Sequence, residues 1–231
     1  MKLVTYRHKS KDRVGALIGD DTLVDLPEFT SMEALIAGGD RALDSARELA
    51  ASPEDSAVHP LNSVQLLSPL PCPPQMRDFM CFEKHLRQAF DALINARAAQ
   101  SDNPEAAAQE LRDSGLFAIP AVWYQQPTYY KCNRFAVTGT GTDVRWPDYS
   151  DVIDYELEFA AVIGKRGTDI SRDQAATHIF GYTIFNDFSA RDAQSVEMEG
   201  KLGPAKGKDF DNANVLGPCI VTADEIGDPY A

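Results

Sequence analysis

The chain has 231 residues, of which 44% are hydrophobic and 25% charged, as in a soluble globular protein with room for one large domain or a small domain plus a larger one. It carries 35 acidic against 22 basic residues, and this net charge of −13 excludes the overall basic character expected of a nucleic-acid-binding protein. The four cysteines form no close pair, and no apolar run resembles a signal peptide or spans a bilayer. We therefore expect a reduced cytoplasmic protein with no nucleic-acid or membrane partner.

The first 70 residues predict a small β/α unit. Three segments have the apolar pattern of strands, residues 3–6, 14–18 and 22–26, and the turn at Gly19 joins the last two in a hairpin. Two short helices with good capping residues follow, over residues 31–37 and 40–51. Four prolines in residues 68–74 predict a stiff connector. We expect a small N-terminal domain over residues 1–70 and a second domain over residues 71–231.

The second region alternates helical and strand-like segments. Helices are predicted over residues 84–99 and 104–112, from Ser171 towards His178, and from Ser189 onward. Strands are predicted over residues 78–82, 121–124, 135–138, 155–163 and 181–187. Together these segments predict a mixed α+β, β-rich fold, with helices outside many short strands.

Glu156 and Glu158 lie inside residues 155–163, an apolar stretch that is otherwise typical of a buried strand. Successive side chains on a strand point to opposite faces, so the two carboxylates share one face and the apolar side chains line the other. Like charges side by side repel unless a cation lies between them. A bound divalent metal is the economical explanation of this pair.

Asp187 closes another apolar strand just before a predicted helix, a common place for a functional carboxylate. With Glu156 and Glu158 it would offer oxygen ligands to a hard cation such as Mg²⁺, Mn²⁺ or Ca²⁺. Histidine and cysteine are missing from the set, which disfavours zinc. From spacing alone, three unrelated surface acids are the alternative.

Four further side chains are candidates for the chemistry. Arg191 and Gln194 lie three residues apart, on one face of the predicted helix, where they could hold a substrate carboxylate or keto group. Lys208 stands in a glycine-bracketed basic turn and could neutralise an anion beside the metal. His85 follows a predicted strand and could act as a general base. An exposed helix face, a solvated lysine and a structural histidine are the plainer interpretations.

Several ordered motifs resemble the fumarylacetoacetate hydrolase family. The run Asp-Tyr-Glu-Leu-Glu-Phe-Ala-Ala-Val-Ile-Gly at residues 154–164 looks like the metal-binding strand of that family. The similarity continues in order through residues 181–194, 207–211 and 216–218, and residues 1–6 look like the start of the small N-terminal domain that many members carry.

The resemblance implies a β-roll that holds Mg²⁺ or a similar ion on Glu156, Glu158 and Asp187. It also implies that Arg191, Gln194, Lys208 and, by a looser match, Tyr130 line the substrate site. His85 stands where members place the histidine that activates water, which makes it and Lys208 the catalytic candidates. Family members are commonly dimers, so the resemblance implies a homodimer.

The implied activity is metal-dependent hydrolysis of a carbon–carbon bond in an acylpyruvate or a related β-diketo or 2-oxo acid. Hydration, isomerisation or decarboxylation of a 2-oxo acid is the alternative, as is a non-catalytic member. Gln88 stands where several members have a glutamate one helical turn after the histidine, which weakens the hydrolase prediction. The family fold continues beyond the segment that resembles residues 207–224, so the expected roll is incomplete.

Overall fold

The computed structural model describes residues 1–230, and they form two compact units. The first comprises Met1–Met76 together with Cys132–Ala231, and the second is Arg77–Lys131. Both contain helices and strands, so the predicted mixed α+β class is confirmed.

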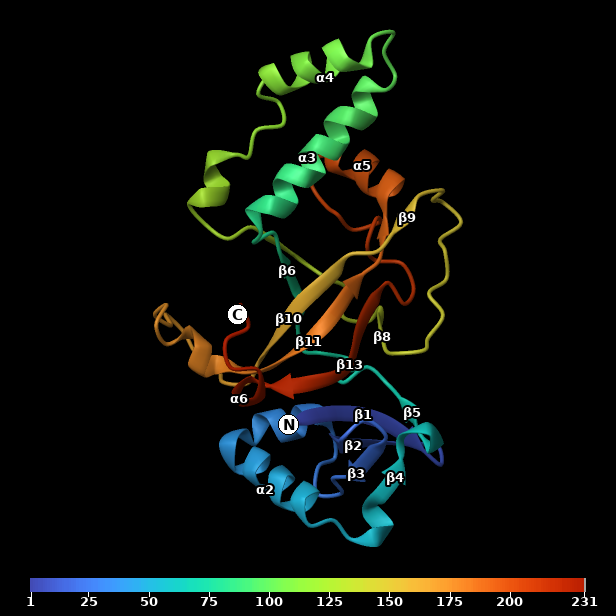
Figure 1. The fold of residues 1–231 in the computed structure, drawn as a ribbon, viewed down its shortest axis with the longest axis vertical. Helices are drawn as coiled ribbons and strands as arrows, with labels where there is room; N and C mark the ends of the chain where they lie inside the picture. The colour runs from blue at the N-terminus through green and yellow to red at the C-terminus, as the bar shows by residue number, and fades with distance from the viewer. Residues whose placement is uncertain (231) are drawn as a thin grey trace. The chain divides into compact units, whose positions relative to one another are not determined.

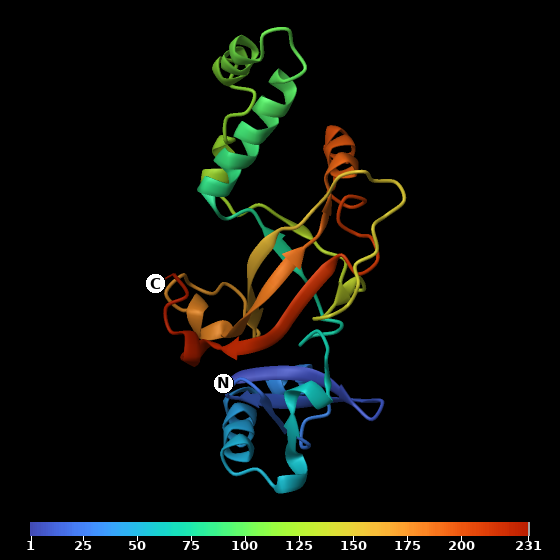
Figure 2. The same cartoon turned by 45° about the vertical axis from the view of Figure 1, so that its right-hand side comes forward.

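A nine-stranded sheet forms the frame of the first unit. Seven strands follow the order β10-β11-β13-β1-β2-β3-β4, while β5 pairs with β1 and β8 pairs with β13. Figures 1 and 2 show β10, β11 and β13 side by side from two directions. The strands are β1 (Lys2–His8), β2 (Lys11–Ile18), β3 (Thr22–Asp25), β4 (Val58–Pro60), β5 (Gln65–Leu66), β8 (Val137–Thr138), β10 (Leu157–Ile163), β11 (Ile179–Asp187) and β13 (Asn214–Thr222). A separate short pair joins β9 (Ile153–Asp154) to β12 (Ser189–Ala190).

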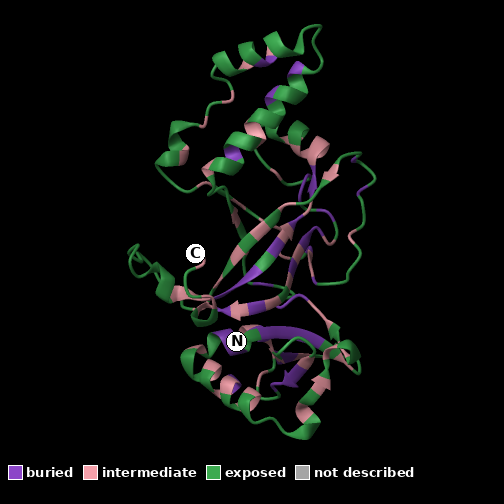
Figure 3. Cartoon of the chain, in the orientation of Figure 1, coloured by how far each residue is buried: buried purple, intermediate pink, exposed green. Residues whose placement is uncertain are grey.

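The N-terminal strands and helices follow the sequence prediction closely. Strands β1, β2 and β3 form consecutive antiparallel pairs, and α1 (Met32–Ala37) begins where the Ser31 hydroxyl accepts a hydrogen bond from the Ala34 amide. Helix α2 (Gly39–Ala51) follows directly, and 3₁₀ turns cover Asp55–Ala57 and Leu61–Ser63. The largest core cluster joins this segment to the end of β13 through Leu3, Leu35 and Ile220, all fully buried. Figure 3 shows the resulting burial along β1.

The N-terminal and C-terminal strands share backbone hydrogen bonds. Lys2 and Leu3 of β1 lie opposite Val221 and Ile220 of β13, and the amino group of Met1 donates to the Thr222 hydroxyl at 2.6 Å. One sheet therefore crosses the boundary expected near residue 70, and the division into domains at that point stays a prediction. Helix α6 (Ala223–Ile226) follows β13.

The prediction that residues 155–163 form a buried strand is wrong about burial. The strand β10 exists, but its apolar face is largely exposed, with Leu157 71%, Phe159 52% and Ile163 62% accessible. The reason is that no element of the unit's described residues packs against this face, since Ile184, which lies opposite Phe159 on the inner strand β11, is also 48% exposed. The alternation correctly separated two faces, but it could not tell which face would be covered.

The helical unit contains α3 (Glu83–Ala98), α4 (Pro104–Asp113) and the strand pair β6 (Arg77–Phe79) and β7 (Tyr129–Lys131). Its two helices bury Ile94, Ala98 and Ala108 between them. The strand predicted over residues 121–124 is wrong, because this segment forms a 3₁₀ turn, Ala121–Tyr124, after Pro120. Among residues 1–230, no helix is both long enough and apolar enough to cross a membrane.

Candidate metal centre

Two neighbouring strands bring the three predicted metal ligands together. Strands β10 and β11 pair antiparallel, with Glu158 opposite Phe185. The backbone pairing continues past Leu157, the first residue of β10. There the Asp187 amide donates to the Glu156 carbonyl at 3.0 Å. This backbone bond holds Glu156, which lies between β9 and β10, beside the last residue of β11.

The carboxylates of Glu156, Glu158 and Asp187 converge. One oxygen from each lies within 4.8 Å of the other two. The Asp187 side chain is fully buried and that of Glu156 is 17% exposed. Like charges at this separation and burial require nearby positive charge, as the sequence analysis predicted.

Lys208 supplies part of that positive charge. Its Nζ donates to Glu156 Oε2 and to Asp187 Oδ2, both at 2.6 Å, and its side chain is only 3% exposed. A buried lysine is costly unless it is paired, and here two carboxylates pair with it. The ammonium therefore links the end of β11 to the residue that precedes β10.

Gly207 allows the loop of Lys208 to approach α5 (Arg191–Glu199) closely. A Cβ atom on Gly207 would lie 2.6 Å from Gln194 Cβ and 2.8 Å from Gln194 Cα, which is too close for any side chain. The Ala190 amide also donates to the Gly207 carbonyl at 2.8 Å. The glycine that brackets the basic turn is thus needed to place Lys208 in the site.

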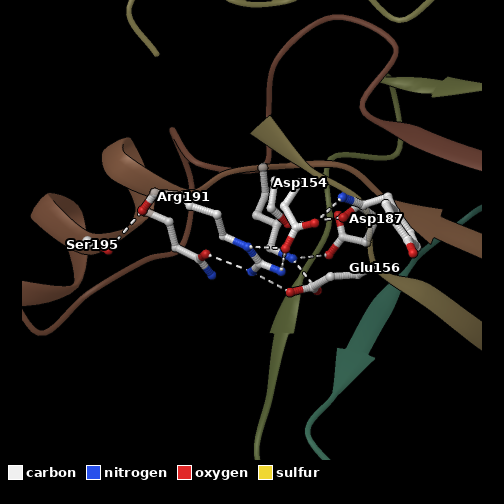
Figure 4. A network of polar contacts seen from close by, with 9 residues as sticks. Asp154, Glu156, Asp187, Arg191 and Ser195 are labelled. Atoms are coloured by element: carbon white, nitrogen blue, oxygen red, sulfur yellow. Dashed lines mark hydrogen bonds and ion pairs between the residues drawn. The ribbon is translucent and has the colours of Figure 1, made fainter. Parts of the chain in front are cut away.

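Arg191 is the second cation of the site, and Figure 4 shows it reaching from the start of α5 towards Glu156. Its guanidinium donates to Glu156 Oε1, to the Gln194 side-chain oxygen at 3.2 Å, and to Asp154 Oδ2 at 3.1 and 2.9 Å. Several bonds in different directions hold the guanidinium plane in one orientation. Both carboxylate oxygens of Glu156 therefore accept a bond from a cation.

These contacts set the charge states of the site. Burial by itself would raise the pKa of Glu156, but the neighbouring Lys208 and Arg191 outweigh burial and hold that pKa below its usual range. Burial likewise opposes the charge on Lys208, yet Asp187 and Glu156 raise its pKa. Both partners of the pair are therefore charged at neutral pH.

The donor set fits a hard divalent cation. Three carboxylates converge against two cationic side chains, which leaves net negative charge, and every candidate ligand atom is an oxygen. Glu156, Glu158 and Asp187 are the residues that would hold the ion.

The structure places the other predicted site residues in two groups. Arg191, Gln194 and Lys208 lie with the metal ligands in the first unit. His85, in the first turn of α3, and Tyr130, on β7, belong to the helical unit, and their roles stay predictions.

Asp154, which was not among the predicted site residues, pairs with Arg191. Its signal was present, because acidic residues stand at every second position, 154, 156 and 158.

Comparison with known proteins agrees with the motifs. The profile described as "Fumarylacetoacetate (FAA) hydrolase C-terminal" matches residues 96–231, more than half of the chain. The chain belongs to the fumarylacetoacetate hydrolase family. The resemblance inferred from residues 154–164 and the motifs that follow it is confirmed.

The names of proteins similar to this chain give different activities. Oxaloacetate tautomerase YisK of Bacillus subtilis is 31% identical over 99% of this chain and 72% of its own length. Human mitochondrial oxaloacetate tautomerase FAHD2A is 37% identical over 46% of this chain and 33% of its own length. A maleylpyruvate hydrolase from Sphingobium, solved with manganese(II) and pyruvate, has the same fold with a TM-score of 0.62 at 19% identity, over 99% of this chain and 70% of that one. The chain thus spans about a third to three quarters of the length of these relatives.

Proposed function

We propose that this chain is a divalent-metal-dependent isomerase that interconverts the keto and enol forms of oxaloacetate or a similar 2-oxo dicarboxylic acid. The observation that carries the proposal is the 31% identity to an oxaloacetate tautomerase over 99% of the chain. Isomerisation of a 2-oxo acid was the alternative that the sequence motifs left open beside carbon–carbon bond hydrolysis, and it is the one proposed.

Tautomerisation moves a proton between carbon and oxygen through a negatively charged enolate. A divalent cation on Glu156, Glu158 and Asp187 would supply electrophilic stabilisation to the oxygens of the keto acid. Lys208 adds a buried positive charge in the same cluster, where a water-poor environment strengthens its field. Its role is to stabilise the negative charge that develops on the substrate.

Arg191 is suited to bind a substrate carboxylate. Its side chain is 31% exposed, so part of the guanidinium is accessible while Asp154 and Glu156 fix its orientation. The oxygen of Gln194 accepts a further bond from it and helps to hold it in place. A dicarboxylic substrate has a second anionic group that can accept a charge-assisted hydrogen bond from this guanidinium.

The residues around His85 favour isomerisation over hydrolysis. His85 and Gln88 are both exposed on α3, and the nearby Glu83 carboxylate is bonded to Arg87. A hydrolase needs a water molecule activated by a base, and a neighbouring carboxylate would support the charged imidazole. Tautomerisation needs a base that takes the proton from carbon but no attacking water, so it does not depend on a histidine–carboxylate pair that activates water.

The test compares three reactions of the metal-loaded chain side by side: loss of the oxaloacetate enol followed by ultraviolet absorbance, cleavage of an acylpyruvate, and isomerisation of a 2-hydroxydienoate. We expect acceleration of the first reaction, its loss on metal removal, and its loss in Glu156→Ala. Glu199→Ala, which changes an exposed glutamate at the end of α5, is the matched control and should keep full activity.

Each other outcome has a defined meaning. Acylpyruvate cleavage without enol conversion would replace the proposal with the hydrolase activity. Metal binding without any of the three reactions would support a non-catalytic member. Full activity in Glu156→Ala would contradict the assignment of the metal ligands.

A further inference from the structure

Lys208 contacts two of the residues that would hold a metal ion. Its ammonium contacts one oxygen of Glu156 and one of Asp187 at 2.6 Å, and the second oxygen of Glu156 is bonded to Arg191. Glu156 and Asp187 therefore already hold a cation. A divalent ion that approached the same oxygens would be repelled by the ammonium, and burial strengthens this repulsion.

We propose that Lys208 is a resident counter-ion that a divalent metal must displace from Glu156 and Asp187. Lys208 then stabilises the metal-free chain and lowers its affinity for metal, so that the site fills only where metal is plentiful. This inference rests on the metal site of the proposed function, and it goes further by assigning Lys208 a role before any substrate binds.

The contacts of the two cations indicate which one moves. Arg191 is held by Asp154 and Gln194 as well as by Glu156. Lys208 carries its charge at the end of a flexible four-carbon chain, whereas the planar guanidinium is fixed by its several bonds. The ammonium is therefore the cation that can withdraw while the carboxylates stay in place.

The test is Mn²⁺ binding to the metal-stripped chain, measured by calorimetry in the absence of any substrate. Lys208→Met removes the charge and should lower the dissociation constant for Mn²⁺ at least about tenfold, because two buried carboxylates lose their competing partner. The matched control is Lys206→Met, since Lys206 is exposed and stands two residues earlier in the same loop. Its dissociation constant should stay within about twofold of that of the natural chain, as expected for an exposed charge.

Thermal unfolding gives a second measurement. Metal-free Lys208→Met should melt below the natural chain, and saturating Mn²⁺ should raise its melting temperature by more than it raises that of the natural chain. If Lys208→Met does not fold without metal, Lys208→Gln replaces it, because glutamine is neutral but still donates hydrogen bonds.

Unchanged or weaker Mn²⁺ binding in both neutral variants would overturn the proposal and show that Lys208 positions the carboxylates for the metal. The outcome is independent of the reaction catalysed. If Lys208→Met binds Mn²⁺ more tightly but the natural chain has no tautomerase activity, the counter-ion proposal is supported and the tautomerase proposal is refuted. If the natural chain is an active tautomerase but Lys208→Met binds Mn²⁺ no more tightly, the reverse holds.

Discussion

Asp187→Asn is the substitution whose effect on stability the structure defines most directly. It keeps the shape of a fully buried side chain and removes one carboxylate that holds the Lys208 ammonium. Removal of one partner from a buried ion pair costs about 3–5 kcal/mol when the other charge is left unpaired. Glu156 still accepts a bond from Lys208, so we expect roughly half of that loss, about 2 kcal/mol.

The loss is large enough to measure in a chain of this size. A change of about 1 kcal/mol shifts the melting temperature of a 150–250-residue protein by about 2–4 °C, so metal-free Asp187→Asn should melt about 4–8 °C below the natural chain. Asp154→Asn is the matched control, because Asp154 is 48% exposed and its pair with Arg191 is a surface ion pair. That control should lose about 0.5 kcal/mol, or about 1–2 °C.

Differential scanning calorimetry of the metal-free proteins is the assay, with Mn²⁺ titration as a second arm. The Mn²⁺ affinity should fall sharply in Asp187→Asn and little in Asp154→Asn. An unchanged or higher melting temperature in metal-free Asp187→Asn would refute the reasoning, since it would mean that repulsion among the carboxylates outweighs their attraction to Lys208.

Three further predictions concern the frame of the fold. Burial and the neighbouring imidazole of His8 lower the pKa of His59, so the unfolded chain takes up a proton first as pH falls. The free energy of unfolding should therefore decrease below about pH 6.5. His59→Gln should make this free energy less dependent on pH, as measured by denaturant titrations at several pH values. The same pH dependence in His59→Gln and in the natural chain would contradict the role given to His59. A Cβ atom at Gly181 would lie 2.4 Å from the Val221 carbonyl oxygen across β11 and β13, so Gly181→Ala should lower the free energy of unfolding by about 1–3 kcal/mol, and an unchanged denaturation midpoint would argue against this contact. Ser31→Ala removes the cap of α1 and should cost about 1 kcal/mol, whereas equal melting temperatures would mean that the cap contributes nothing.

The local features of the site could be predicted from the sequence. Alternation along residues 155–163 placed Glu156 and Glu158 on one face, because strand geometry alone decides that. Gly207 and Lys208 were singled out by their pattern. The strand pairs of the N-terminal region and the positions of α1 to α4 could also be predicted, since turn residues, caps and apolar periodicity act over a few residues.

What the sequence by itself determined is therefore which residues can bind a cation and which segments form helices or strands. The tertiary structure decided the rest, because it depends on contacts between distant segments. The pairing of β10 with β11 brings Asp187 to Glu156, and the loop after α5 brings Lys208 between them. Burial also depends on such contacts: the apolar face with Leu157 and Phe159 was expected inside, but no other element packs on it among the described residues of the unit, and that face is exposed.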